Sequence, residues 1–287
     1  MNGVRDVVSR LTSEIRNIHI SSPISAIRAD PEDPALATIQ CNTAGGTTVY
    51  TGFHHIIFGT QANHAVPILA SYLSSLPLNS PQRQPVEEQI RCLRKFQYRP
   101  TIVINHTDGT LVPDTAKDRR DLNLICLDTK GPNLSWETVP SNCVPPSYTM
   151  ATQVLPPPVH YPSHLPAVYQ TTNPILEPRD DSILSVARLE RAVLNAEAKH
   201  ALSGLYQETG RKWWQCAVQC AGGLGPLQGA GKLSNIAEEA KGPGIWICGS
   251  YAYAGIPLLE GCVVSARTVV QAIVTLEREE FEGTDRS

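Results

Sequence analysis

The sequence predicts a mixed α/β fold in which one layered unit is interrupted by an inserted unit. Near both ends of the chain, a short apolar run of strand length precedes a segment of helical periodicity: 55–58 precedes 62–73, and 244–249 precedes 259–276. Between these ends, the segment 132–178 holds eleven of the 23 prolines. Such a density of proline favours loops around short extended pieces, which separates the middle of the chain from its ends.

The expected organisation has one discontinuous unit and one insert. A polar, proline-bearing stretch at 76–85 marks the first boundary. We therefore expect residues 1–80 and 225–287 to fold together. Residues 81–224 should form the insert, with a mostly antiparallel sheet and some helices.

Three segments allow a more local prediction. Apolar residues at helical spacing predict a helix over 4–15, and the glycine-containing turn 42–46 predicts a β-hairpin. The segment 183–205 leaves two alternatives open. It forms either one long helix, or a strand followed by a shorter helix that begins at Ala196 and is capped by Asn195.

Composition and charge exclude several classes of protein. The chain has 287 residues, 18% of them charged, and a formal net charge of -3, so no broad positive field draws it to nucleic acid. Its uninterrupted apolar runs are shorter than the ~20 residues that a membrane helix needs. Charges spread through residues 1–20 break any signal-peptide pattern. We expect a cytoplasmic protein that binds neither nucleic acid nor a membrane.

The cysteines do not predict a metal site. The chain has eight cysteines but no CxxC pair, and no histidine lies near Cys216 and Cys220 at zinc-finger spacing. We expect ordinary thiols in a reducing compartment and no bound metal.

The chemistry is concentrated in the last part of the chain. A strand ends at Gly249, a glycine-bearing loop follows, and a helix begins near Leu259. Free N–H groups and the positive dipole end at such a helix start stabilise negative charge. Gly249 lets the backbone approach a ligand closely, and Gly255 and Gly261 remove side chains around the bend.

The run from Gly249 to Ala266 resembles the closing flavin-binding motif of the flavin-containing amine oxidase superfamily. The resemblance implies FAD as cofactor, with Gly249 and Ser250 at the phosphate and ribityl chain. It also implies that Leu258, Leu259 and Glu260 lie under the isoalloxazine carbonyl, where reduction builds negative charge. Ser250 stands where the family has an acidic residue, and Cys262 stands where it has alanine.

Further likenesses support the same family. The segment 20–27 resembles the strand that contacts the adenine, which makes Ile24 a cofactor-binding candidate, and 53–60 resembles the strand that returns to the sheet beside the cofactor. Residues 105–108, 148–150 and 171–174 are similar to a branch of these oxidoreductases. The resemblance therefore implies a partial FAD/NAD(P)-binding, Rossmann-like domain interrupted by an α+β substrate domain.

The nucleotide-binding fingerprint of this family is missing. No GxGxxG follows a strand anywhere in the sequence, so the chain is expected to be the C-terminal part of such an enzyme. A truncated gene model or a gene split in two would explain this, and in a split gene a separate polypeptide supplies the missing half. The alternative is a non-catalytic fragment or interaction module. Exposed apolar surface along residues 1–60 would favour a partner polypeptide.

The resemblance implies oxidation of a small organic substrate, with hydride passing from a C–H bond to the flavin. Tyr251 and Tyr253 precede the flavin-facing helix and are the candidates for the substrate side. No catalytic side chain is identified, because the cofactor itself accepts the hydride. For Glu260, capping of the helix start is favoured over catalysis.

Other conspicuous residues have plainer interpretations. His54 and His55 would point to opposite faces of a strand, so they cannot share an ion. A turn interaction at Asp108 is favoured over an acid–base pair with His106. The glycine-rich run 225–231 suits a loop better than a phosphate site, and Trp213–Trp214 suits a packed helix better than a substrate aperture.

Overall fold

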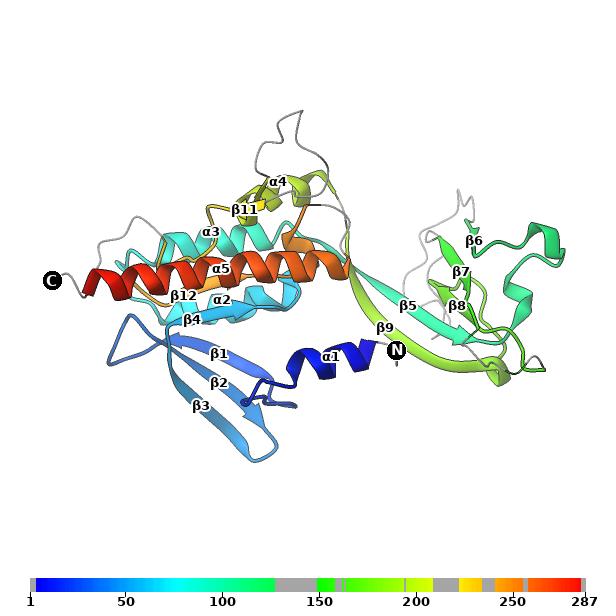
Figure 1. Ribbon diagram of the computed structural model, residues 1–287, viewed down its shortest axis with the longest axis horizontal. Helices are drawn as coiled ribbons and strands as arrows, with labels where there is room; N and C mark the ends of the chain where they lie inside the picture. Colours follow the sequence, from blue (N-terminus) through cyan, green and yellow to red (C-terminus); the bar gives the residue numbers. More distant parts are fainter. Residues whose placement is uncertain are drawn as a thin grey trace. The chain divides into compact units, whose positions relative to one another are not determined.

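The computed structural model describes two compact units. One, here called the discontinuous unit, comprises Met1–Gln97 and Leu194–Ser287, and the other, the central unit, comprises Tyr98–Val193 (Figure 1). The described residues are 4–126, 149–157, 162, 164–193, 195–208, 222–233, 241–254 and 258–284. Helices and strands both contribute substantially, which confirms the mixed α/β class.

The discontinuous unit begins with a short helix and an antiparallel meander. Helix α1 (Val4–Thr12) confirms the predicted N-terminal helix, although none of its residues is buried. Strands β1 (Ile24–Ala29), β2 (Ala37–Thr43) and β3 (Gly46–Phe53) pair in the order β1-β2-β3. The β2–β3 turn lies within the predicted hairpin segment, where Thr43 pairs with Gly46.

A parallel pair of strands forms the second sheet of this unit. Strand β4 (His55–Phe58) lies beside β12 (Gly244–Ile247), although 185 residues separate the two strands along the chain. Every residue of β12 is buried. Helix α5 (Leu259–Thr284) covers β12, where Trp246 packs against Val269. The predicted strand and helix near the C-terminus are therefore present, whereas residues 255–257 of the predicted turn, which include Gly255, lie outside the described residues.

Three more helices and a small hairpin complete the unit. Helices α2 (Ala62–Ser75) and α3 (Arg83–Leu93) pack together, and α4 (Ala196–Leu205) packs on α3. Strands β10 (Tyr206–Glu208) and β11 (Gly222–Leu224) form an antiparallel pair, and β10 contacts α4. These helix contacts explain why the units divide at 97/98 and 193/194 rather than at the expected 80/81 and 224/225.

The central unit is one antiparallel sheet of five strands in the order β6-β7-β8-β5-β9. All four of its strand pairs are antiparallel, as expected for the insert. Its described part contains 3-10 turns but no α-helix. The strands are β5 (Tyr98–His106), β6 (Leu122–Ile125), β7 (Met150–Val154), β8 (Tyr169–Thr172) and β9 (Ile183–Ala192).

The ambiguous segment after β8 resolves in favour of a strand followed by a helix. β9 ends at Ala192, and the side chain of Asn195 accepts a hydrogen bond of 2.7 Å from the N–H of Ala198. This is the N-cap geometry that the second alternative required.

Helix α5 is more apolar over its length than the uninterrupted apolar runs of the sequence indicate. Over Leu259–Glu279 it is long and apolar enough to cross a membrane by length and composition, with a mean hydropathy of 1.4. Arg267, Thr268, Gln271 and Thr275 interrupt the apolar residues of this helix, so no uninterrupted apolar run indicates its overall hydropathy. Core helices pass the same test, so a single helix is weak support for a membrane.

Candidate cofactor-binding turn

Strand β12 delivers the chain to a turn that only glycine accommodates well. Gly249 has φ 146°, a conformation that L side chains rarely adopt, and an added Cβ would lie 3.1 Å from the ring of Tyr251. The 3-10 turn Ser250–Ala252 follows, closed by a bond of 3.1 Å from the N–H of Ala252 to the carbonyl of Gly249. The backbone therefore bends sharply at the end of the strand.

Ser265 on α5 holds this turn in place. Its hydroxyl accepts a hydrogen bond of 3.0 Å from the N–H of Gly249 and lies 2.7 Å from the carbonyl of Gly261. Ser265 is buried. The N–H of Gly249, which was expected to contact a phosphate, is thus already satisfied. The sequence did not predict these hydrogen bonds of Ser265, because a serine inside a helix gives no sign of a partner that lies far away along the chain.

Several backbone donors around the turn remain available. Within the described part of the chain, no hydrogen bond satisfies the N–H or hydroxyl of Ser250, or the N–H groups of Leu259 and Glu260. Leu258 and Leu259 are 58% and 71% exposed. The N–H groups of Leu259 and Glu260 lie at the start of α5, where the helix dipole is positive and Glu260 is the acidic residue of the first turn.

The two candidate tyrosines are packing residues in this structure. Tyr251 is buried and meets Phe96 edge to face at 5.1 Å. Tyr253 is half-buried and meets Tyr206 edge to face at 5.3 Å. Both rings thereby fix the turn.

Ile24 lies in a different sheet from the turn. It begins β1, pairs with Cys41 of β2 and is 42% exposed. None of the hydrogen bonds of the described residues joins it to Gly249 or Ser250. The structure therefore brings together the C-terminal candidates but does not connect Ile24 with them.

Two buried glutamines support β12 from the side opposite β4. The Gln228 side chain donates to the carbonyl of Ile247 at 2.7 Å and accepts from its N–H at 2.9 Å. The Gln89 side chain donates to the carbonyl of Ile245 at 3.0 Å. The N–H of Gly229 donates to that same carbonyl. The glycine-rich run 225–231 is therefore a loop that pairs with β12.

A chain of polar side chains anchors α5 to β4. The indole N–H of Trp246 donates to Nδ1 of His55 at 3.0 Å, so Nε2 of His55 carries the proton and donates to Glu277 at 2.7 Å. Lys232 reaches the same Glu277 oxygen at 3.4 Å. The bond from His55, and then the charge of Lys232, hold the pKa of Glu277 below its usual value. His55 is thus a structural residue.

In the central unit, Asp108 makes a turn interaction rather than an acid–base pair. Its carboxylate accepts from the N–H of Thr110 and the N–H of Arg179, both at 3.0 Å. Burial would raise its pKa, but these bonds lower the pKa of Asp108 to about 2. Nδ1 of His106 accepts from the backbone N–H of Asp108 at 3.1 Å, and its Nε2 lies 2.7 Å from Oγ1 of Thr171.

Among the described residues, Cys248 is a buried thiol and no metal-ligand cluster is present. The described residues contain no group of three or more His, Cys, Asp or Glu side chains that could hold a metal ion. Burial, and then the neighbouring Cys262, raise the pKa of Cys248, which keeps it protonated. Trp213 and Trp214 lie outside the described residues.

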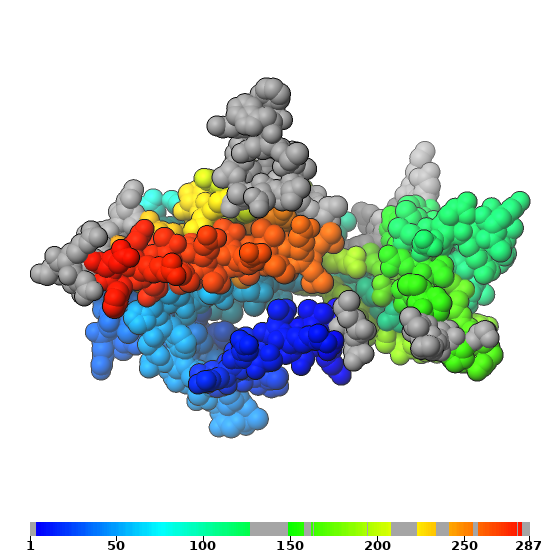
Figure 2. Space-filling model, viewed as in Figure 1, coloured from blue at the N-terminus to red at the C-terminus, as the bar shows by residue number. Residues whose placement is uncertain are grey.

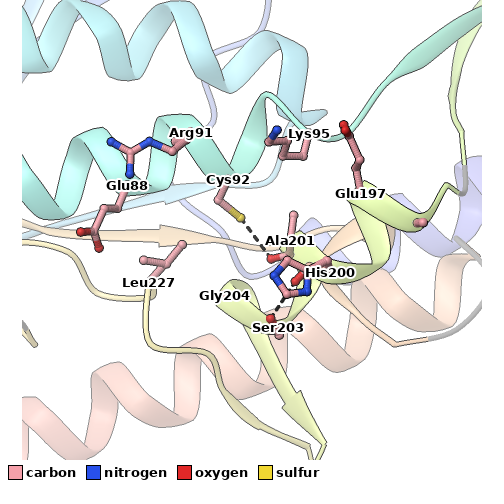
Figure 3. A pocket seen from close by; sticks show the side chains of 11 residues that line it. Glu88, Arg91, Cys92, Lys95, Glu197, His200, Ala201, Ser203, Gly204 and Leu227 are labelled. Atoms are coloured by element: carbon pink, nitrogen blue, oxygen red, sulfur yellow. Dashed lines mark hydrogen bonds between the residues drawn. The ribbon is translucent and has the colours of Figure 1, made fainter.

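A cavity of about 600 Å³ lies between α3 and α4, and it shares no residue with the turn (Figure 3). Cys92 on α3 donates to the carbonyl of Ala201 on α4 at 3.2 Å. Burial raises the pKa of the Cys92 thiol to about 11, so it is not a nucleophile at neutral pH. Both signs of charge occur at its edge: Glu88, Arg91, Lys95 and Glu197.

Comparison of the chain with models of known protein families finds no match, and comparison with curated proteins finds none either.

Proposed function

We propose that this chain is part of a flavin-dependent oxidoreductase of the amine-oxidase type, and that its β12–α5 turn binds FAD. One observation carries the proposal. A buried parallel strand ends in Gly249 at positive φ, and the turn then leads to a helix start with unsatisfied N–H groups. Parallel strands that open onto a helix N-terminus are the usual setting of dinucleotide sites.

The residues of the turn fit an anionic, planar cofactor. The N–H and hydroxyl of Ser250 are available for a phosphate, and the N–H groups of Leu259 and Glu260 are available for a ring carbonyl. FAD would supply hydride acceptance when bound. The chain would bind and orient it, and the positive end of α5 would stabilise negative charge near its first turn. The substrate would be a small organic molecule.

The second candidate is a non-catalytic interaction module, which would use the exposed apolar surface along residues 4–24. Helix α1 buries no residue, and its apolar side chains are open to solvent. Such a surface fits a separate polypeptide, which in the first proposal would supply the rest of the cofactor domain. The exposed residues are Val4, Val7, Val8, Leu11, Ile15, Ile18, Ile20 and Ile24, each at least 42% exposed.

Flavin binding separates these candidates. The purified full chain is mixed with FAD, desalted and scanned for flavin absorbance, and its thermal unfolding is followed with and without FAD. We expect retained flavin and an upward shift in the unfolding temperature. Gly249→Ala should weaken FAD binding at least about tenfold through backbone strain. Gly45→Ala, in an open hairpin turn, is the matched control.

A colourless protein whose unfolding temperature does not respond to FAD would refute flavin binding by this chain alone and favour the interaction module. Equal binding by Gly249→Ala and Gly45→Ala would place the cofactor somewhere other than the β12–α5 turn.

A further inference from the structure

Strand β4 has one unpaired edge. The N–H of Gly244 donates to the carbonyl of His54 at 2.8 Å, and the N–H of Cys248 donates to the carbonyl of Phe58 at 2.9 Å. Because backbone groups alternate along a strand, the N–H and carbonyl of Ile57 face away from β12. No described strand pairs with this edge, and Ile57 is 47% exposed. Such an edge is a template for another strand.

Helix α5 carries a second apolar face besides the one that covers β12. At 3.6 residues per turn, five exposed apolar side chains fall within about 60° of one another around the helix. Figure 2 shows α5 running along the surface. The five residues, here called the outer stripe, are Leu259, Val263, Val270, Val274 and Phe281, each between 43% and 72% exposed.

The outer stripe and the open edge of β4 lie on the same flank. Glu277, which bonds His55 on β4, shares the angular position of Leu259 because about 18 residues make five turns. The outer stripe therefore faces the side of β4 that lies away from β12. α5 runs antiparallel to β12, since Ser265 meets Gly249 at the end of that strand and Glu277 meets His55, which pairs with its start.

These contacts also determine which residues of α5 lie at the same height as Ile57 of β4. Ile57 lies two residues after His55, which is about 6.6 Å along the strand. At a rise of about 1.5 Å per residue, that distance corresponds to roughly four residues back from Glu277 on α5. Ile57 is therefore level with residues 272 and 273.

We propose that a second copy of this chain docks on this surface. The two-fold axis of the dimer passes beside Ile57, at the height of Ala272 along α5. Antiparallel pairing of β4 with its symmetry mate lets the two Ile57 residues exchange both of their outward hydrogen bonds. The same axis places residues equidistant from position 272 opposite one another. Val270 then faces the partner's Val274, and Val263 faces the partner's Phe281.

Charge complementarity follows from the same axis. Arg267 makes no ion pair within the described part of the chain, and it would face the partner's Glu277, whose side chain is 49% exposed. A self-complementary patch of this kind forms a closed two-fold dimer, the commonest symmetric assembly.

Sedimentation equilibrium of the full chain tests this assembly. We expect a species of twice the 31.2 kDa chain mass. Val270→Glu buries a charge near the axis and should raise the dimer dissociation constant at least about tenfold. Val49→Glu, at a 57% exposed position on β3, is the control and should leave the dimer intact. Neither readout depends on flavin.

A cross-link provides a second measurement that does not depend on weakening the dimer. In a hydrogen-bonded antiparallel pair the two Cα atoms of residue 57 would lie about 5.5 Å apart, within disulfide range. Ile57→Cys should therefore form a dimeric disulfide under mild oxidation, whereas wild-type protein and Val49→Cys should not. A chain that stays monomeric overturns the proposal, even if another polypeptide binds this surface. A dimer that tolerates Val270→Glu and does not cross-link at residue 57 overturns it as well.

Discussion

The backbone hydrogen bonds of β12 in the discontinuous unit and those of the five-stranded sheet in the central unit are satisfied in different ways. In the discontinuous unit, β12 has one true strand neighbour, and the loop 225–231 together with the side chain of Gln228 replaces the other. In the central unit, five strands pair directly with one another. Polar side chains there form a buried chain of their own, from His106 through Thr171 to Thr152.

This difference shows where each sheet is vulnerable. The parallel pair depends on side chains that come from distant positions in the sequence, so a single change at such a position exposes β12. The antiparallel sheet depends on its own backbone, and its side-chain network adds to an already paired structure. The predictions below test this contrast, beginning with the largest expected effect.

Gln228→Leu should destabilise the discontinuous unit by about 3 kcal/mol. The change removes the side-chain bonds to Ile247 and to the carbonyl of Leu205, and it leaves the buried N–H and carbonyl of Ile247 unsatisfied. The carbonyl of Leu205 still accepts from the N–H of Gly225. Urea unfolding measures the loss, and hydrogen exchange of a peptide covering 244–248 should locate it. Gln84→Leu, at an exposed position on α3, is the control and should change stability by less than about 0.5 kcal/mol. Equal losses in the two variants would remove any special role for Gln228.

Thr171→Val should cost the central unit about 2 kcal/mol, less than the change at Gln228. Thr171 Oγ1 lies 2.7 Å from Nε2 of His106 and 2.9 Å from Oγ1 of Thr152, and all three side chains are buried. Hydrogen exchange of a peptide covering 98–106 should accelerate. Thr47→Val, at an exposed position on β3, provides the control for the substitution itself. Unchanged exchange in Thr171→Val would show that the backbone pairing alone sets the stability of this sheet.

Local signals in the sequence were enough to predict most elements. The turn at 42–46, the cap at Asn195 and the strand that ends at Gly249 depend on neighbouring residues, whose propensities the sequence shows directly. The strand 55–58 was equally clear as a short apolar run ending in glycine.

Long-range partners were beyond the reach of these signals. Periodicity shows which face of an element is buried but not what covers it. The clamp by Ser265, the bonds of Gln228 to β12 and the place of α3 in the discontinuous unit therefore came only from the structure. The same limit applies to Tyr251. Its position beside a predicted site indicated a substrate contact, whereas in the structure its ring packs on Phe96.

Acidification should weaken the central unit through His106, with a smaller effect than Thr171→Val. Burial lowers the pKa of His106 from 6.5, and the nearby Asp108 carboxylate opposes this shift without cancelling it. The unfolded chain therefore binds the proton more readily. The stability is fully present above pH 6.5 and is lost as the pH falls from there through the folded pKa. Exchange of a peptide covering 98–106, compared at pH 7 and pH 5 after correction for intrinsic rates, measures the loss. His106→Gln should show a weaker pH dependence, and an unchanged dependence would assign the acid response to another group.

Glu277→Gln should have the smallest effect, about 0.5 kcal/mol at neutral pH. The amide oxygen of Gln can still accept from His55, so the change isolates the charge from the hydrogen bond, and the half-exposed carboxylate is screened by solvent. The folded pKa of Glu277 is lowered mainly by the His55 bond, so its contribution is present above pH 4.5 and is lost as the pH falls below that value. Urea unfolding in the Val270→Glu background removes any contact with a second copy, and Glu282→Gln on the same helix is the control. A loss of several kcal/mol would mean that α5 depends on the bonds of Glu277 to His55 and Lys232 as strongly as β12 depends on Gln228. Buried side-chain hydrogen bonds and surface charge would then contribute equally to this unit, and the contrast between them would fail.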